Sequence, residues 1–315
     1  MRQYVLRRVA LAVPTLVLVS VIVFSMMRLM PGDVVLRMVE GHAYAPTVEA
    51  LRKELGLDRP AYLQYLEWVG GILTRGDFGT SYWTRQPILE EFFHRFPVTL
   101  ELAVLTILVS VIVGILVGIV SAVRQDSASD YVGRVFAILA LSGPYFGLAV
   151  LVVVLPSIWF KWTPVWTYVP LSTSPLENLK IMIVPALVFG VTRAGPIMRI
   201  MRSALLDVLR QDYIRTAWSK GLPERVVVLR HALKNAMIPV ISLVGLQTPL
   251  YIAGSVIMEA IFRLPGVGLF FFDALMRLDY PVVQSVNLIV ATLVVGLNLA
   301  IDLTYAFLDP RIRYQ

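Results

Sequence analysis

Residues Gln211–Val240 read QDYIRTAWSKGLPERVVVLRHALKNAMIPV, a polar passage between hydrophobic segments. The pattern predicts a short helix over Tyr213–Lys220 and a second over Glu224–Ala236 that continues into a hydrophobic span. The break between them falls at Gly221-Leu222-Pro223, because glycine suits the position after a helix end and proline suits the first turn of the next helix. A connection with this much order is more than a simple turn.

The composition around this passage is that of a membrane protein. Of the 315 residues 57% are hydrophobic and 16% are charged, and the mean hydropathy is +0.74. A soluble domain carries roughly 25% charged residues. In a soluble chain the net charge of +7 would suggest nucleic acid as a partner, but here the basic residues lie beside hydrophobic spans. We therefore expect an all-α, polytopic protein in a lipid bilayer, with no nucleic acid partner.

Six hydrophobic segments are long enough to cross a hydrocarbon core of about 30 Å as helices. They are Val9–Leu29, Val98–Val123, Gly133–Trp159, Leu179–Ile200, Met237–Phe262 and Val283–Phe307. The first resembles a signal peptide in its charge order, but it is longer than an h-region of about 7–15 residues and ends without a small-residue cleavage site. We expect it to be an uncleaved span.

The segment between the first two spans is expected to form a cap outside the membrane, because it is too long for a hairpin loop. Three short helices are predicted in it, around Thr47–Gly56, Ala61–Leu73 and Pro87–Arg95, with Thr47 as an N-cap. The expected division of the chain is residues 1–29 for the first span, 30–97 for the cap and 98–315 for a five-helix core. That core includes a cytoplasmic coupling loop over 200–236.

Charge and aromatic residues predict the orientation. The loop between the fourth and fifth spans is the most basic one, and the C-terminal tail adds Arg311 and Arg313. The loop and both termini are therefore expected in the cytoplasm. Aromatic residues near the outer end of the third span suit an interfacial belt: Trp159, Trp162, Trp166 and Tyr168. Proline is expected to kink or open the third span near Pro144 and the fifth at Pro249.

Polar residues within the spans leave two interpretations open. Gln247, Tyr251, Ser255 and Glu259 recur every four residues along the fifth span and so share one helical face. They are either the wall of a translocation path or partners in hydrogen bonds between helices. Arg193 is expected in the cytoplasmic third of the fourth span, where its side chain can extend to the interface. Gly114 and Gly118 suggest close helix packing.

Motifs for catalysis are missing from the sequence. No Gly-Lys dipeptide occurs, so there is no Walker A loop, and no H-E-x-x-H or G-x-S-x-G motif occurs either. The three histidines, His42, His94 and His231, are too scattered to predict a metal site. We expect no catalytic residue, cofactor or metal in this chain, and the absence of cysteine excludes disulfides and Fe–S clusters.

Several phrases of the sequence resemble one family. The T-A-x-x-K-G spacing that ends at Gly221, followed by a helix and Ile238-Pro239, is similar to the EAA loop of ABC-importer permeases, with Thr216-Ala217-Trp218 in place of Glu-Ala-Ala. The M-P-G-D after the first span, LGLDRPAYLQYLEW, GDFGTS and the E-A-I-F-x-L-P-G-x-G segment extend the likeness over nearly the whole chain. The chain resembles the dipeptide/oligopeptide/nickel permeases, in particular their first (B-type) subunit.

This resemblance implies a set of partners in a bacterial or archaeal cytoplasmic membrane. They are a second (C-type) permease, two cytoplasmic ATPases that bind ATP and Mg, and an extracytoplasmic substrate-binding protein. It also implies that Tyr213, Thr216, Ala217, Lys220 and Gly221 form the coupling helix that contacts an ATPase.

The implied cargo is a di- or oligopeptide, while a nickel chelate, glutathione or an oligosaccharide stays open. A stand-alone carrier or channel is the alternative in another class, and a membrane-embedded enzyme is a third. A basic amphipathic hairpin lying on the inner membrane surface is the alternative for residues 211–240.

Overall fold

The computed structural model describes residues 2–39, 47–161 and 167–308. The expected tail residues Arg311 and Arg313, the histidine His42 and the belt residues Trp162 and Trp166 lie outside the described residues. Within the described ranges every regular element is a helix, apart from one isolated β-bridge between Thr80 and Pro87. The all-α prediction is confirmed.

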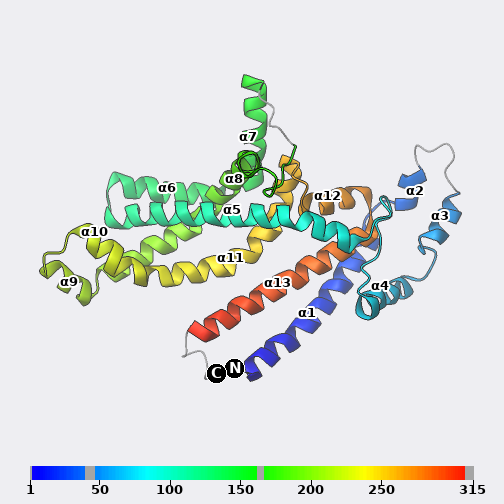
Figure 1. The fold of residues 1–315 in the computed structure, drawn as a ribbon, viewed down its shortest axis with the longest axis horizontal. Helices are drawn as coiled ribbons and strands as arrows, with labels where there is room; N and C mark the ends of the chain where they lie inside the picture. Colours follow the sequence, from blue (N-terminus) through cyan, green and yellow to red (C-terminus); the bar gives the residue numbers. More distant parts are fainter. Residues whose placement is uncertain (1, 40–46, 162–166, 309–315) are drawn as a thin grey trace. The chain divides into compact units, whose positions relative to one another are not determined.

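The helices follow one another along the chain as labelled in Figure 1. They are α1 (Arg2–Leu29), α2 (Val34–Val39), α3 (Val48–Glu54), α4 (Ala61–Arg75), α5 (Ile88–Val123), α6 (Ala128–Ser142), α7 (Tyr145–Phe160), α8 (Pro175–Leu209), α9 (Asp212–Ser219), α10 (Glu224–Val226), a π-helix (Val227–Ala232), α11 (Leu233–Phe262), α12 (Val267–Arg277) and α13 (Tyr280–Leu308). Among the described residues, five helical segments are long and apolar enough to cross a membrane, and the pair α6–α7 makes a sixth if counted as one broken span.

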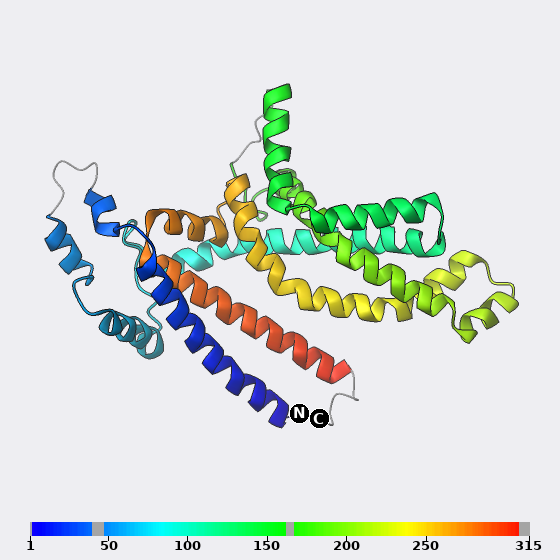
Figure 2. The same ribbon diagram turned by 180° about the vertical axis from the view of Figure 1, so that it is seen from behind.

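The third span is the broken one. Helices α6 and α7 meet at an angle of 94° across Gly143 and Pro144. Pro144 has no amide hydrogen and disfavours helical backbone in the residue before it, so the helix ends there. The expected interruption is confirmed, whereas α11 stays helical through Pro249 and only bends (Figure 2).

The chain divides into two compact units, and each is described by itself. Unit 1 contains Met1–Val98 and Pro265–Gln315, and unit 2 contains Thr99–Leu264. In unit 1, α13 runs alongside α1 in both views (Figures 1 and 2). The sequence grouped the sixth span with the other core helices, whereas in the structure it packs with the first span and the cap.

The cap of unit 1 is held by polar contacts to α13 and to Asp279, the residue before this helix. Trp68 of α4 donates its indole N–H to Ser285 Oγ at 3.1 Å, and Ser285 Oγ donates to the carbonyl of Phe78 at 2.6 Å. Ser81 Oγ and the Tyr82 amide both donate to the buried carboxylate of Asp279, at 2.5 and 3.1 Å. The cap therefore belongs to an ordered unit.

The beginning of the cap is ordered by two local polar devices. Thr47 Oγ1 accepts a hydrogen bond from the Ala50 amide at 3.4 Å, which confirms the predicted N-cap of α3. Asp33 accepts a hydrogen bond from the Val35 amide at 2.8 Å and forms an ion pair with Arg52 of α3. Partial burial acts to raise the pKa of Asp33, but these hydrogen bonds outweigh it and hold the pKa below its ordinary value.

One cap helix differs from the expectation. Residues 87–95 were predicted as a short helix before a separate span, but they are the first turns of the 36-residue α5. The helix passes through Pro97, which costs one backbone hydrogen bond. Apolar residues on both sides of Pro97 continue the same helix, and membrane helices tolerate such a proline.

Unit 2 is organised around α8, which packs against α6, α7 and α11. Its close approach to α5 depends on glycine. A Cβ on Gly114 would lie 2.7 Å from Ile197 Cβ, and one on Gly118 would lie 2.7 Å from Met201 Cβ. On the facing helix, a Cβ on Gly190 would lie 2.6 Å from Val109 Cβ. The predicted packing role of Gly114 and Gly118 is confirmed.

Candidate functional site

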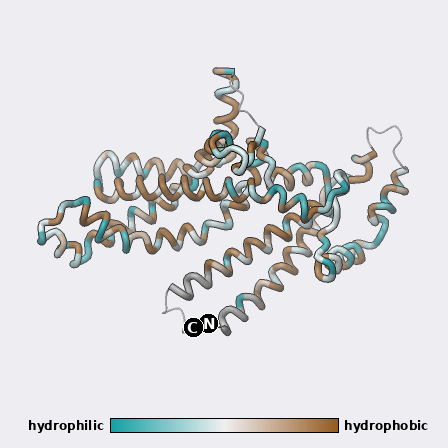
Figure 3. Tube along the Cα trace, in the orientation of Figure 1, coloured by the Kyte–Doolittle hydropathy of each residue, from teal (hydrophilic) through white to brown (hydrophobic). Residues whose placement is uncertain are grey.

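The connection between α8 and α11 forms the predicted helix and break. Helix α9 ends at Ser219, and Gly221 adopts a φ of +72°, a left-handed conformation that suits glycine. Pro223 precedes the first turn of α10. The following helix differs from the expectation in one respect, since Val227–Ala232 is wound as a π-helix before α11 begins. Figure 3 shows hydrophilic residues concentrated around α9 and its turn.

Helix α9 is held by its apolar face. Ile214 and Ala217 are buried in a cluster with residues from the ends of the neighbouring spans. The other buried members of this anchor cluster are Ala122, Ile197, Met201, Leu205, Val227, Val228, Ala232, Ala236 and Val240. They come from α5, α8, the π-helix and α11. Helix α9 is therefore packed against residues of three spans.

The opposite face of α9 is open. Tyr213 is 43% exposed and Trp218 is 41% exposed, and both Thr216 and Lys220 lie on the surface. The Tyr213 hydroxyl accepts a hydrogen bond from Asn235 Nδ2 at 2.8 Å, which fixes the ring near the base of α11. Of the five predicted coupling residues, Tyr213, Thr216, Lys220 and Gly221 are accessible to a partner, whereas Ala217 is buried as part of the anchor.

The exposed surface around α9 is basic. Its exposed cations are Arg215, Lys220, Arg225, Arg230 and Lys234. Arg215 pairs with the exposed Asp212 on the same helix at 3.2 Å, an arrangement worth little in water. Exposed aromatic rings among cations are typical of protein-binding surfaces. The face therefore suits a soluble partner with acidic groups.

The polar face of α11 lies mostly inside the unit. Tyr251, Ser255 and Glu259 are buried, and only Gln247 is partly exposed. The Tyr251 hydroxyl is hydrogen-bonded to Ser110 of α5 at 2.9 Å, and Ser255 Oγ donates to Glu259 Oε1 at 3.0 Å. The contact of Tyr251 with Ser110 joins two helices, as in the alternative of hydrogen bonds between helices, whereas the contact of Ser255 with Glu259 lies within α11. Helical spacing shows only that these side chains share a face, so the wall of a translocation path stays a prediction.

Sequence reasoning missed an ion pair that ties α6 to α8. The Asp130 carboxylate is buried and accepts two hydrogen bonds from Arg202, each 2.7 Å long, and one from Ser121. The available signal was weak: an acidic residue in the first turn of a helix and an arginine near the basic loop.

Arg193 does not extend toward the cytoplasm as expected. Its guanidinium carbon lies 5.3 Å from the ring centre of Phe189 and 5.6 Å from that of Tyr145. Phe189 is one turn nearer the outer end of α8, in keeping with the tilt of helical side chains toward the N-terminus. The side chain is partly buried in unit 2.

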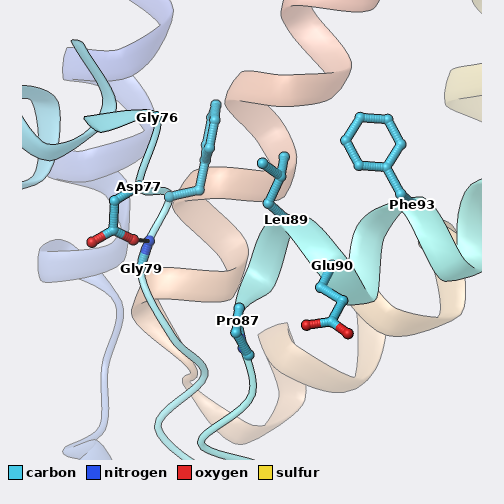
Figure 4. A pocket seen from close by; sticks show the side chains of 8 residues that line it. Gly76, Asp77, Gly79, Pro87, Leu89, Glu90 and Phe93 are labelled. Atoms are coloured by element: carbon cyan, nitrogen blue, oxygen red, sulfur yellow. Dashed lines mark hydrogen bonds between the residues drawn. The ribbon is translucent and has the colours of Figure 1, made fainter. Parts of the chain in front are cut away.

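A pocket of about 390 Å³ opens in unit 1 beside the start of α5 (Figure 4). It is lined by Gly76, Asp77, Phe78, Gly79, Pro87, Leu89, Glu90 and Phe93. Asp77 accepts a hydrogen bond from the Gly79 amide at 2.8 Å, so this carboxylate stabilises the turn before α5. In the part of the chain that the structure describes, no group of acidic and histidine side chains is arranged to hold a metal ion.

Comparison with protein families accounts for nearly the full length of the chain. Residues 114–314 match the family of binding-protein-dependent transport system inner membrane components, and residues 1–103 match the N-terminal model of the same systems. The chain belongs to this family. It is therefore a multi-pass membrane permease component of an ABC transport system, and the expected family resemblance is confirmed.

Individual relatives cover the chain from end to end. It is 39% identical to the dipeptide transport system permease protein DppB of Escherichia coli (strain K12), with complete coverage of both chains. It is also 39% identical to the di/tripeptide transport system permease protein DppB of Pseudomonas aeruginosa (strain UCBPP-PA14), again with complete coverage. A crystal structure of an amino acid ABC transporter with histidines matches 71% of this chain and 94% of its own, with a TM-score of 0.50 and 13% identity. That likeness concerns the fold alone.

Proposed function

We propose that this permease is one transmembrane subunit of an ATP-driven importer of di- and oligopeptides. It would form half of the translocation path and pair with a second, C-type permease in a bacterial or archaeal inner membrane. The full-length relatives from Escherichia coli and Pseudomonas aeruginosa are named as peptide permeases, which supports the cargo class. The observation that carries the coupling role is α9, an exposed helix whose buried face joins the ends of three spans.

In this proposal ATP and Mg are bound by two cytoplasmic ATPase subunits and not by this chain. One of the two ATPases receives α9 of this chain through the exposed Tyr213, Thr216, Trp218 and Lys220. Closure of the ATPase pair displaces α9, and the anchor cluster passes the displacement to α5, α8 and α11. A packed apolar cluster suits this task because close-packed interiors transmit strain.

The cap is proposed as the docking region for an extracytoplasmic binding protein. It is hydrogen-bonded to Ser285 of α13 and to Asp279 just before α13, so it presents an ordered surface. Selection of the cargo would then rest mainly with the binding protein.

The test is ATP hydrolysis by the reconstituted complex of two permeases and two ATPases, with and without binding protein loaded with peptide. The informative variant is Gly221→Pro, because proline cannot adopt the φ of +72° and removes the amide that donates to the Trp218 carbonyl at 2.9 Å. Gly221→Asn is the matched control, since asparagine tolerates left-handed backbone.

Stimulation by loaded binding protein that survives in Gly221→Asn and is lost in Gly221→Pro is the expected result. Movement of peptide into liposomes by the purified chain without ATPases would replace this proposal with a stand-alone carrier. Stimulation by binding protein carrying a nickel chelate, glutathione or an oligosaccharide, and not by peptide, would refute the peptide cargo alone.

A further inference from the structure

An arginine–aromatic cluster lies in unit 2 at the break of the third span. We define it as Tyr145 at the start of α7, Phe189 and Arg193 of α8, and Tyr251 of α11. The rings of Tyr145 and Phe189 lie 4.9 Å apart, and those of Phe189 and Tyr251 lie 6.2 Å apart. The guanidinium of Arg193 covers the first two rings. Three helices thus converge on one cation.

Gly254 allows the backbone of α11 to pass close to this cluster. A Cβ on Gly254 would lie 2.5 Å from Phe189 Cζ and 3.5 Å from Arg193 Nη2. Glycine is therefore needed where α11 passes the phenylalanine ring and the guanidinium. The cluster is a packed arrangement, with Arg193 held from two sides.

The depth of Arg193 follows from the polar contacts at the two ends of α8. Near the outer end, Asn178 Nδ2 donates to Glu101 Oε2 at 3.2 Å, and near the cytoplasmic end Arg202 binds Asp130. Arg193 precedes Arg202 by nine residues, or about 13 Å along a helix, and follows Asn178 by about 22 Å. Its side chain points outward, away from the nearer surface. The charge therefore lies within the hydrocarbon depth of the membrane.

A charged side chain at this depth has a free-energy cost that other interactions must offset. Arginine inside a membrane is costly and is found facing protein or a water-filled cavity, paired with an opposite charge or with backbone carbonyls. No carboxylate of the described ranges lies within salt-bridge distance of Arg193. The two aromatic faces offset part of the cost. They also leave the guanidinium, a planar group with five N–H donors, able to bind an anion.

We propose that Arg193 binds the carboxylate of the peptide cargo as it passes through the permease. This inference rests on the proposed function and names the cargo group that the path itself recognises. Every peptide with a free C-terminus carries this carboxylate whatever its side chains. The fork geometry of a guanidinium matches a carboxylate in a bidentate pair. Because the rings of Tyr145 and Phe189 compete with the carboxylate for the guanidinium of Arg193, the contact is weak enough for the peptide to be both bound and released.

The first arm of the test separates transport from ATP hydrolysis in the reconstituted complex with its binding protein. Arg193→Gln is expected to lower peptide uptake by about tenfold or more, because one charge-assisted contact is lost. Stimulated ATP hydrolysis stays within about twofold, since the anchor cluster is untouched. Arg193→Lys restores part of the uptake. Arg199→Gln, an exposed arginine on the same helix, is the matched control and keeps uptake unchanged.

The second arm compares the uptake of a peptide that has a free C-terminal carboxylate with the uptake of the same peptide amidated at its C-terminus. Each uptake rate is divided by the occupancy of the binding protein with that peptide. The defect of Arg193→Gln is expected for the acid and not for the amide. Equal loss for both, or unchanged uptake of the acid, overturns the proposal. Failure of both Arg193 variants to assemble with the second permease also overturns it, and assigns the arginine to structure or to the subunit interface. A wild-type complex that imports no peptide refutes the proposed function itself.

Discussion

The contact between α5 and α8 offers a quantitative test of the packing in unit 2. Replacing Gly114 by alanine adds a Cβ that would lie 2.7 Å from both Cβ and Cγ2 of Ile197 and 3.0 Å from the Ala194 carbonyl oxygen. Ordinary carbon–carbon contacts are about 3.5–4.0 Å, so the helices must separate by about 1 Å. Ile197 is buried, the position of its Cβ is fixed by the backbone, and its β-branched side chain has little freedom to move Cγ2 away.

The expected change in the free energy of unfolding of Gly114→Ala follows from two opposing effects. Overpacking a well-packed core costs about 1–3 kcal/mol. Alanine in place of glycine within a helix returns up to about 1 kcal/mol. Gly296→Ala in α13 is the matched control, because no atom lies within 4 Å of its added Cβ and only the second effect operates. Gly114→Ala should therefore be less stable than Gly296→Ala by about 1–3 kcal/mol.

The assay is unfolding of the purified chain in mixed micelles by increasing fractions of a denaturing detergent, followed by helical circular dichroism. Parallel titrations of wild type and the two variants provide the comparison. Equal stability of Gly114→Ala and Gly296→Ala would refute the close approach of α5 to α8.

Three further predictions concern other contacts. Asp130→Ala leaves its arginine partner on α8 without an opposite charge and should lower the free energy of unfolding by about 3 kcal/mol in the same titration. The control Asp126→Ala, at an exposed position, should lower it by less than about 1 kcal/mol. Equal effects of the two substitutions would contradict the buried pair. The pKa of Asp33 in the folded protein is below its ordinary 3.8. Its pairing with Arg52 therefore stabilises the cap fully above pH 3.8, and this stabilisation is lost as the pH falls through the folded pKa. Melting curves between about pH 5 and pH 3 should show this loss in wild type and a shallower one in Asp33→Asn, and parallel curves would argue against it. Deleting Thr47–Gly56 should impair peptide uptake and leave co-purification with the ATPases intact, while loss of co-purification would count against docking at the cap.

Local sequence features predicted the elements and several of their ends. Hydrophobic length identified the spans, because a helix must satisfy its own backbone groups across the hydrocarbon core. Gly221, Pro144 and Thr47 act through their own backbone or through neighbours within a turn, so their effects could be predicted from sequence. The small-residue spacing at Gly114 and Gly118 likewise predicted a close helix contact, although not the helix that makes it.

Only the tertiary structure decided which residues far apart in the sequence contact one another. A four-residue period placed Tyr251, Ser255 and Glu259 on one face of a helix, but not against Ser110 or inside the unit. The pairing of Asp130 with Arg202 and the aromatic contacts of Arg193 depend on how α6, α7 and α8 pack. Sequence alone thus determined which segments are helical and membrane-spanning, because those properties arise within a few turns of chain. Which polar groups are buried together, and which stay available to a partner or a cargo, depends on long-range packing between helices.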